Sequence, residues 1–233
     1  MAASPWQCLA TLRDVAEIGL PTQANPKPVT EQRRALVRAS SLFAPYLRKK
    51  YGLPLALHVT DVLVTSSAGS ATVEGAPTGD AADVRIEVVA GGAVSGGAVT
   101  IRVSKDNGTA GTWAPTATLP ASGQVTVDGV LVTLSGTWAA GEAVTYTAGP
   151  DPGVRAAVAQ IASYLMYYNR GGNPAAMAPY KEGYDQAIAF GKMLAKADEG
   201  ELDQQKADAT PGRAEGGPLW VATSREDFVR GRY

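Results

Sequence analysis

Residues 51–60 read YGLPLALHVT, and one sequence periodicity ends and another begins within this stretch. Upstream, the apolar residues between positions 36 and 47 recur at helical spacing. The helical pattern ends at Tyr51-Gly52, and Leu53 precedes a proline, which disfavours the helical region of backbone space. From His58 onward, apolar and polar residues alternate, as in a half-buried strand. The sequence therefore predicts a change from helix to sheet at this point.

A Gly/Thr/Val-rich block, about residues 59–149, carries the strand pattern. Within it, Val84, Ile86 and Val88 alternate with charged residues, which predicts a strand with one buried face. The segments that share this pattern are 59–65, 70–74, 84–88, 99–103, 112–119, 124–127, 130–135 and 143–148. About seven or eight short strands, with frequent turns and no helical stretch, indicate an immunoglobulin-like β-sandwich.

Two dipeptides and two tryptophans add detail to this block. Asn107-Gly108 and Asp128-Gly129 are typical of tight hairpin turns, which need positive φ angles. Trp113 and Trp138 are expected to pack in the core or at an edge of the sandwich. Because an exposed tryptophan can also contact a sugar ring, a carbohydrate-binding role for the block stays open.

Two helices are predicted before the block. Thr11 can act as an N-cap for a short helix over residues 11–19. A longer helix is expected from an N-cap at Thr30 to about Lys50, and Pro45 should kink it because proline removes a helical hydrogen bond.

Two more helices are predicted after the block. Asp151-Pro152 combines an N-cap with a proline at the first helical position, and the helix it starts should stop at Gly171-Gly172. The next helix follows Asn173-Pro174 and ends near Gly200. The helical pattern on the two sides is that of one interrupted domain.

The fold class that follows is a multidomain α plus β protein. Residues 1–57 and 150–202 form one discontinuous four-helix domain, and residues 58–149 form the inserted all-β sandwich. Residues 203–218 lack any apolar period and are expected to be a flexible linker. Residues 219–233 regain large apolar side chains. We expect this extended arm to bury them on a partner, with folding back onto its own domain as the alternative.

Composition argues against most enzyme chemistry. Cys8 and His58 are the only cysteine and histidine, too few for a disulfide framework or a structural zinc site. In the predicted layout they lie on different elements, so neither has a catalytic partner. Gly91-Gly92 and Gly96-Gly97 lack the following helix that a phosphate-binding loop requires. We expect no metal, no cofactor and no enzymatic activity.

Charge and hydropathy point away from nucleic acid and membranes. The net charge of −1 divides into −5 for the block and +4 for the remainder, which is too little to indicate a nucleic-acid binder. The first residues lack a basic region followed by an apolar run, and no apolar run is long enough to span a bilayer. We expect a soluble protein that is not secreted by this route and does not insert into membranes.

With residues 58–149 removed, the sequence resembles the Mu-like family of tailed-phage head–tail adaptor proteins, also called head-completion or connector proteins. The resemblance covers most of the helical part. Its matching segments are Thr-Leu-x-Asp at 11–14, the helix exit at 46–55, residues 161–165 leading to Arg170-Gly171-Gly172, Tyr184-x-x-Ala187, and the closing segment 221–233. The inserted block, similar to the immunoglobulin-like decorations of virion proteins, and Pro45 depart from the family pattern.

The resemblance implies a ring of copies that docks under the portal, usually dodecameric, of a DNA-filled phage head. Its expected partners are the portal protein, neighbouring copies, and a stopper or tail-terminator protein, in a virion assembled in the bacterial cytoplasm. We expect the arm to supply the interface residues, which are Trp220, Arg225, Phe228, Arg230 and Tyr233. Arg48, Lys49 and Lys50 could contact packaged DNA or an acidic portal surface, or could simply complement the helix dipole.

Two other functions remain open at this stage. The block could be a carbohydrate-binding or host-surface-binding module that the helices attach to a virion. Alternatively, the chain could be a tail-terminator component, which would occupy the tail side of the joint.

Overall fold

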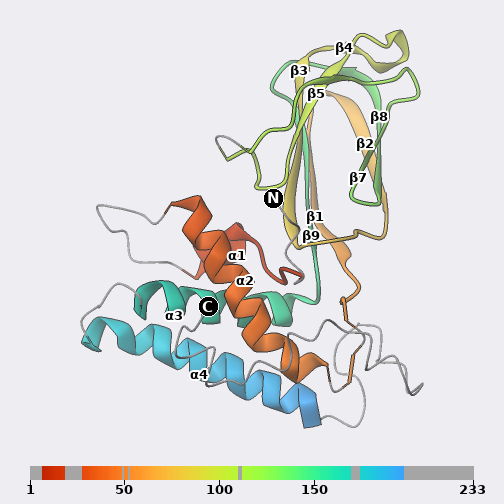
Figure 1. The fold of residues 1–233 in the computed structure, drawn as a ribbon. Coiled ribbons are helices and arrows are strands. Elements are labelled where there is room, and N and C mark those ends of the chain that lie inside the picture. The colour runs from red at the N-terminus through yellow and green to blue at the C-terminus, as the bar shows by residue number, and fades with distance from the viewer. Residues whose placement is uncertain are drawn as a thin grey trace.

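A computed structural model describes residues 7–18, 28–48, 50–51, 53–109, 112–168 and 174–196, and the structural statements below concern these residues. The described chain is an α+β protein with four α-helices and two antiparallel β-sheets (Figure 1). The helices are α1 (Leu12–Glu17), α2 (Val29–Leu47), α3 (Pro152–Tyr168) and α4 (Pro174–Lys196), with a 3₁₀ turn, η1 (Val94–Gly96). The strands are β1 (His58–Thr65), β2 (Ala68–Gly75), β3 (Ala82–Ala90), β4 (Gly92–Ala93), β5 (Thr100–Ser104), β6 (Ala117–Thr118), β7 (Gln124–Val127), β8 (Val130–Trp138) and β9 (Ala143–Gly149).

The helices share one apolar core, although the strands separate them in the sequence. Phe43 of α2 and Ile161 of α3 are both fully buried in this core, together with Leu194 of α4. Figure 1 shows α3 and α4 lying side by side, with α2 crossing α3. Each large apolar side chain buried in this core contributes about 1.5–3 kcal/mol to stability. Because most of the stability of a helix in a protein comes from such packing, each helix depends on its neighbours in the core.

Two predicted helix starts are confirmed. Thr11 and Asp14 form a capping box: the Asp14 backbone N–H donates to the Thr11 hydroxyl at 3.2 Å, and the Thr11 N–H donates to the Asp14 carboxylate at 2.7 Å. At the start of α3, the Gly153 N–H donates to the Asp151 carboxylate at 2.7 Å. The sequence identifies both because the short polar side chain precedes the first apolar turn.

The predicted N-cap of α2, Thr30, is wrong. The helix begins at Val29, and Pro28 occupies the cap position without a side-chain hydrogen bond. The carbonyl of Pro28 accepts the N–H groups of Glu31 and Gln32, at 2.9 and 3.1 Å, so the helical bonds start before Thr30. Pro45 does lie inside α2. The kink expected there stays a prediction.

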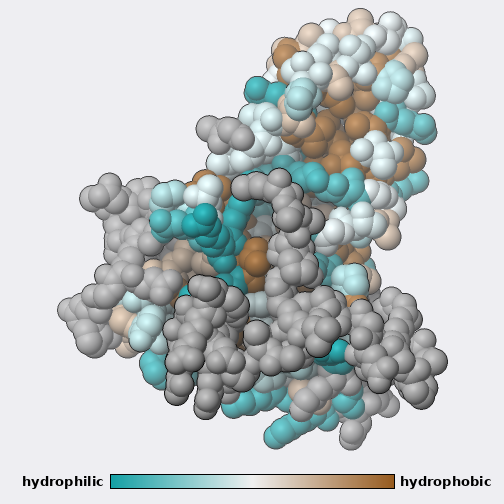
Figure 2. Space-filling model, viewed as in Figure 1, coloured by the Kyte–Doolittle hydropathy of each residue, from teal (hydrophilic) through white to brown (hydrophobic). Residues whose placement is uncertain are grey.

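The strands form a five-stranded sheet with the order β1-β9-β3-β5-β6 and a second sheet with the order β2-β8-β4, in which β7 also pairs with β8. One apolar cluster fills the space between the sheets, with Ile86 of the first sheet and Leu134 of the second among its buried members. Figure 2 shows hydrophobic residues also reaching the surface over the sheets. The sheets therefore have a core of their own.

The ends of the strand block meet. In the antiparallel pairing of β1 with β9, His58 lies opposite Gly149. Opposed residues in such a pair are about 4.5–5.5 Å apart between Cα atoms. The chain thus leaves the helical part and returns to it through neighbouring positions, and α2 and α3 can pack against each other.

The predicted strand over residues 112–119 is largely wrong. Only Ala117–Thr118 forms strand there, together with an isolated bridge between Trp113 and Ser104. Pro115 lacks an N–H and interrupts the ladder, and Pro120 follows closely. The turn prediction is confirmed at Asp128-Gly129, where both φ angles are positive, 47° and 85°, between β7 and β8.

The tryptophans differ in exposure. Trp138 is 1% exposed, and its indole N–H donates to the Ser135 carbonyl at 3.0 Å. Its ring lies on Gly69, where a Cβ atom would come within 2.4 Å of the ring. Trp113 is half-buried, with the Arg102 guanidinium 4.1 Å from its ring centre. Trp138 packs in the core as predicted, and it has no free face for a sugar.

Glu142 holds the turn between β1 and β2. Its carboxylate accepts the backbone N–H groups of Ser67 and Ala139, at 2.7 and 2.8 Å, and the hydroxyls of Ser66 and Ser67. These hydrogen bonds, led by that from Ala139, stabilise the charged form and lower the pKa of Glu142 to about 2.

We predict a pH dependence that follows from this lowered pKa. The stabilising contribution of Glu142 is complete above the ordinary value of 4.5 and is lost as the pH falls through about 2. Carboxyl ¹³C NMR should place the midpoint of the Glu142 titration near pH 2. In acid, the Ser67 amide of the unchanged protein should lose protection from hydrogen exchange, whereas in Glu142→Gln its protection should not depend on pH. A midpoint near the ordinary value would contradict the hydrogen-bonded turn.

Candidate interaction surface

The described chain gathers tyrosines where α3 and α4 pack together. Five of the nine tyrosines in the sequence lie there, namely Tyr164, Tyr167, Tyr168, Tyr180 and Tyr184. We call these residues the tyrosine cluster. They arise from helical spacing, because Tyr164 and Tyr168 are one turn apart on α3, as are Tyr180 and Tyr184 on α4.

The rings of the tyrosine cluster contact one another between the helices. Tyr167 stacks on Tyr180 with ring centres 4.9 Å apart and an angle of 17° between the rings. Tyr164 lies 4.9 Å from Tyr184 and 5.8 Å from Tyr168. Such ring pairs stabilise a contact by about 0.5–1.5 kcal/mol beyond their buried area, so they also fix the position of the cluster.

The exposure of the tyrosine cluster is graded from core to solvent. Tyr167 is buried, Tyr164, Tyr180 and Tyr184 are half-buried, and Tyr168 is 60% exposed. Burial, followed by the neighbouring Tyr167, raises the pKa of Tyr180. Tyrosine combines a large apolar ring with a polar hydroxyl and few rotatable bonds, and it is enriched at protein interfaces. Tyr168 is therefore the member of the cluster that is exposed enough to contact another protein.

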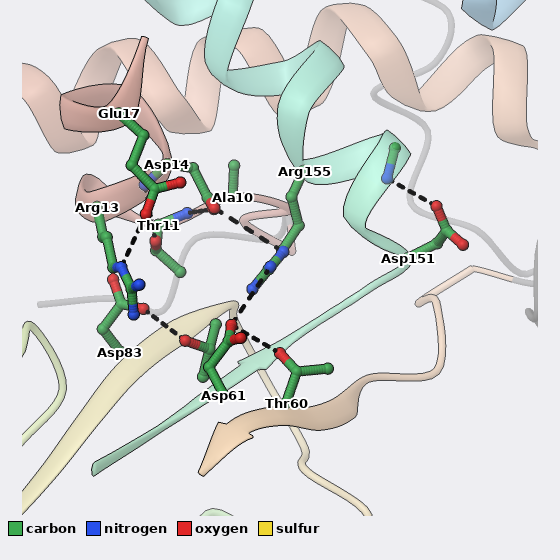
Figure 3. Close-up of polar contacts among 12 residues, drawn as sticks. Ala10, Thr11, Arg13, Asp14, Glu17, Thr60, Asp61, Asp83, Asp151 and Arg155 are labelled. Carbon is green, nitrogen blue, oxygen red and sulfur yellow. Dashed lines mark hydrogen bonds and ion pairs between the residues drawn. The ribbon is translucent and has the colours of Figure 1, made fainter. Parts of the chain in front are cut away.

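A group of charged side chains, separate from the tyrosine cluster, joins the helices to the first sheet (Figure 3). Arg155 of α3 lies between Asp14 of α1 and Asp61 of β1, with a nitrogen-to-oxygen distance of 3.8 Å to each carboxylate. The Arg155 side chain is 12% exposed. Gly149 makes room for it, because a Cβ there would lie 2.7 Å from the Arg155 Cδ. Arg155 thus ties three elements together at the point where β9 leads into α3.

The Arg155 site carries buried charge. Burial raises the pKa of Asp14, while the Thr11 hydrogen bond and the charge of Arg155 lower it. Asp61 adopts a positive φ of 54° at an irregularity in β1. A non-glycine residue in this conformation is uncommon and costs energy, which the surrounding contacts offset.

The chain before α1 also joins the two parts. Cys8 donates its N–H to the Asp80 carboxylate at 2.6 Å, and its carbonyl accepts the Ala81 N–H at 2.8 Å. The Gln7 amide N–H donates to the carbonyl of Leu55 at 3.0 Å. Arg33 of α2 pairs with Asp106. The helices and sheets therefore contact one another through several separate polar links.

The structure describes only some of the interface residues predicted from the sequence. Arg48 and Lys50 are half-buried at the end of α2. The Arg48 N–H donates to the Ala44 carbonyl and the Lys50 N–H donates to the Leu47 carbonyl, both at 3.0 Å. Lys49 lies outside the described residues, as do Trp220, Arg225, Phe228, Arg230 and Tyr233. The predicted linker, 203–218, and arm, 219–233, also lie outside them.

The described residues include the one cysteine of the sequence, Cys8. Burial raises the pKa of the Cys8 thiol to about 11, and the thiol donates to the Ala10 carbonyl. Among the residues the structure describes, no three or more His, Cys, Asp or Glu side chains are grouped to hold a metal ion. Within the same residues, no helix combines the length and apolar character needed to cross a membrane.

No protein-family model, no curated protein and no solved structure matches this chain significantly. The tyrosine cluster and Arg155 were both missed by the sequence reasoning. The recurrence of tyrosine at helical spacing in 164–168 and 180–184 is the signal that could have found the cluster. Arg155 carries no such signal, because its partners are distant in the sequence.

Replacing Arg155 by methionine tests the polar link. Arg155→Met keeps a long apolar side chain but leaves Asp14 buried without a positive neighbour, and should lower the free energy of unfolding by about 1–3 kcal/mol at neutral pH. The loss should shrink below the pKa of Asp14, because a protonated carboxyl needs no counter-charge. Urea unfolding followed by circular dichroism measures both effects.

Lys181→Met provides the matched control. Lys181 forms an exposed pair with Asp185 on α4, away from the Arg155 site, and exposed pairs of this kind contribute only about 0.3–0.5 kcal/mol. Equal losses from the two substitutions, or a pH-independent loss in Arg155→Met, would refute the role assigned to Arg155.

Proposed function

We propose that this chain is a structural virion protein, a head–tail adaptor of tailed phages. In this role it forms a ring under the portal, completes the DNA-filled head and joins it to the neck or tail. The proposal includes no catalytic activity. Its partners are the portal protein, neighbouring copies and a stopper or tail-terminator protein.

The observation that carries the proposal is the apolar core shared by helices from both sides of the strand block. The resemblance to adaptors appears only when residues 58–149 are removed, which is meaningful only if the remaining segments fold together. Phe43 and Ile161, from opposite sides of the block, are buried in the same cluster. The shortened sequence therefore corresponds to one packed body.

The residues that carry the resemblance cap or pack the helices. Thr11 and Asp14 form the capping box of α1. Tyr51 and Leu55, at the exit from α2, are 1% and 3% exposed, and Ala187 of α4 is also buried. These residues contribute to packing, so the pattern that carries the resemblance is a pattern of helix packing, and the adaptor role is proposed from it by analogy.

A ring needs two different contact surfaces on each copy, since only a head-to-tail contact closes at more than two copies. We propose the tyrosine cluster as one surface. The other is the arm, residues 219–233, with Trp220, Phe228 and Tyr233 as anchors and Arg225 and Arg230 as donors to the neighbour. The α2 end, with Arg48, Lys49 and Lys50, is a further candidate for contact with DNA or the portal.

We further propose that residues 58–149 form an inserted immunoglobulin-like sandwich that projects from the ring. Two antiparallel sheets with one apolar cluster between them support this assignment. The opposition of His58 and Gly149 supports the insertion, because a guest with neighbouring ends perturbs its host little. The carbohydrate-binding alternative gains no support from Trp138, whose ring is covered by protein.

Binding to phage heads tests the proposal. Purified protein should co-sediment with DNA-filled, portal-bearing heads that lack it. Tyr168→Ala should weaken this binding by about 30-fold if Tyr168 is an interface hot spot. Tyr168 is 60% exposed, so the substitution should leave folding intact. Val89→Ala, at a 41% exposed position on β3, is the matched control and should bind normally.

Removal of the protein from the phage separates the candidate roles. Particles lacking it should be full heads without tails. Tailed particles that fail to adsorb would favour the binding module, and tails of irregular length without heads attached would favour the tail terminator. Absence of binding to portal-bearing heads would contradict the adaptor role directly.

A further inference from the structure

The helices and the sheets are joined without a common apolar core. Their two buried clusters share no residue. The chain crosses between the two parts twice, before β1 and after β9. Parts of a chain that share little apolar surface are expected to move relative to each other. The segment before α1 supplies contacts that oppose such motion, and we call residues 7–10 the strap.

The strap is seated in the helical core. Leu9 and Ala10 are 2% and 1% exposed and belong to the apolar cluster of the helices. The Leu9 N–H donates to the Ser40 hydroxyl of α2 at 3.0 Å, and that hydroxyl donates to the Leu36 carbonyl at 2.8 Å. Lifting the strap off the helices would expose buried apolar side chains, so the strap belongs to the helical part.

The Gln7 side chain connects the strap to both parts. Its Nε2 group donates to the Leu55 carbonyl and to the Gly79 carbonyl, both at 3.0 Å. Its Oε1 atom accepts the Leu55 N–H at 2.8 Å. Leu55 belongs to the helical cluster, whereas Gly79 lies in the loop between β2 and β3. One carboxamide thus uses both of its N–H groups and its oxygen to hold this loop against the helical part.

The Cys8 backbone makes a second connection to the same loop. Its N–H donates to the Asp80 carboxylate at 2.6 Å, and its carbonyl accepts the Ala81 N–H at 2.8 Å. The loop is itself fixed to the sheets, because the Thr78 N–H and hydroxyl both donate to the Asp128 carbonyl, at 2.8 and 3.1 Å. A contact that holds the loop therefore holds the sheets.

The charge pairs between the helices and the sheets restrain their orientation less. Arg33, which pairs with Asp106, has a side chain that is 50% exposed, and exposed ion pairs contribute little. Arg155 lies 3.8 Å from Asp61, which is beyond hydrogen-bond distance, and the Asp61 side chain is 51% exposed. The strap, in contrast, makes three hydrogen bonds of 2.6–3.0 Å to one loop.

We propose that the strap fixes the sheets in one orientation on the helices. Leu9 and Ala10 hold it to the helical core, and the hydrogen bonds of the two residues before them hold the loop of the sheets. Together these contacts prevent the rotation that the two chain crossings alone would allow. Breaking the hydrogen bonds to the loop frees the sheets without disrupting either apolar core. The inference does not rest on the adaptor role.

The Cys8 thiol reports on the strap, because Cys8 is the only cysteine in the sequence. Cys8 is half-buried and its thiol donates to the Ala10 carbonyl, so a disulfide reagent should label the folded protein slowly. Gln7→Ala removes three hydrogen bonds and should increase the labelling rate at least about tenfold. Gln124→Ala, at an exposed position on β7, is the matched control and should leave the rate unchanged.

Amide ¹⁵N relaxation of the full chain tests the fixed orientation. In the unchanged protein, the amides of the helices and of the sheets should report the same rotational correlation time. In the double variant Gln7→Ala with Asp80→Ala, the sheets should tumble separately and their correlation time should fall below its value in the unchanged protein. Arg33→Met, which removes only an exposed ion pair, should keep one correlation time. Circular dichroism verifies that each variant folds.

Four outcomes would overturn the proposal. They are separate correlation times in the unchanged protein, a single correlation time in the double variant, equal loosening in Arg33→Met, and equal labelling rates in Gln7→Ala and Gln124→Ala. Each of them would leave the adaptor role standing, because binding to phage heads is measured independently.

Discussion

The antiparallel pairing of β1 with β9 is the constraint on which the rest of the molecule depends. By placing His58 opposite Gly149, it returns the chain to the helices next to where it left them. Only then can Ile161 of α3 share a core with Phe43 of α2. Arg155 reinforces the same point, since it contacts Asp14 and Asp61, one on each side of the junction. The helices and the sheets have separate apolar cores, and they are joined at this junction and through the polar contacts of Cys8 and Arg33.

Elements with strong local signals were predictable from the sequence. The capping box at Thr11 and the Asp151 cap depend on residues close in the chain, and the alternation around Ile86 reports one buried face directly. The errors are also local in origin. Residue type favours Thr30 as a cap, although the Pro28 carbonyl already starts the helix, and the alternation in 112–119 hides the effect of Pro115.

The candidate surfaces were harder to predict, because they depend on which elements become neighbours. The tyrosine cluster exists only once α3 and α4 lie side by side, and the Arg155 site exists only once α1, β1 and α3 meet.

Excision of the strand block tests the central claim most directly. The chain with residues 59–148 replaced by a short Gly/Ser linker should keep its helical circular dichroism and unfold cooperatively, because the linker performs the closure that β1 and β9 provide. Closing such a gap costs little, since the loop-closure free energy rises only about 0.6 kcal/mol per doubling of length. Loss of the helical signal in this variant would mean that the helices have no core of their own, and would contradict the account.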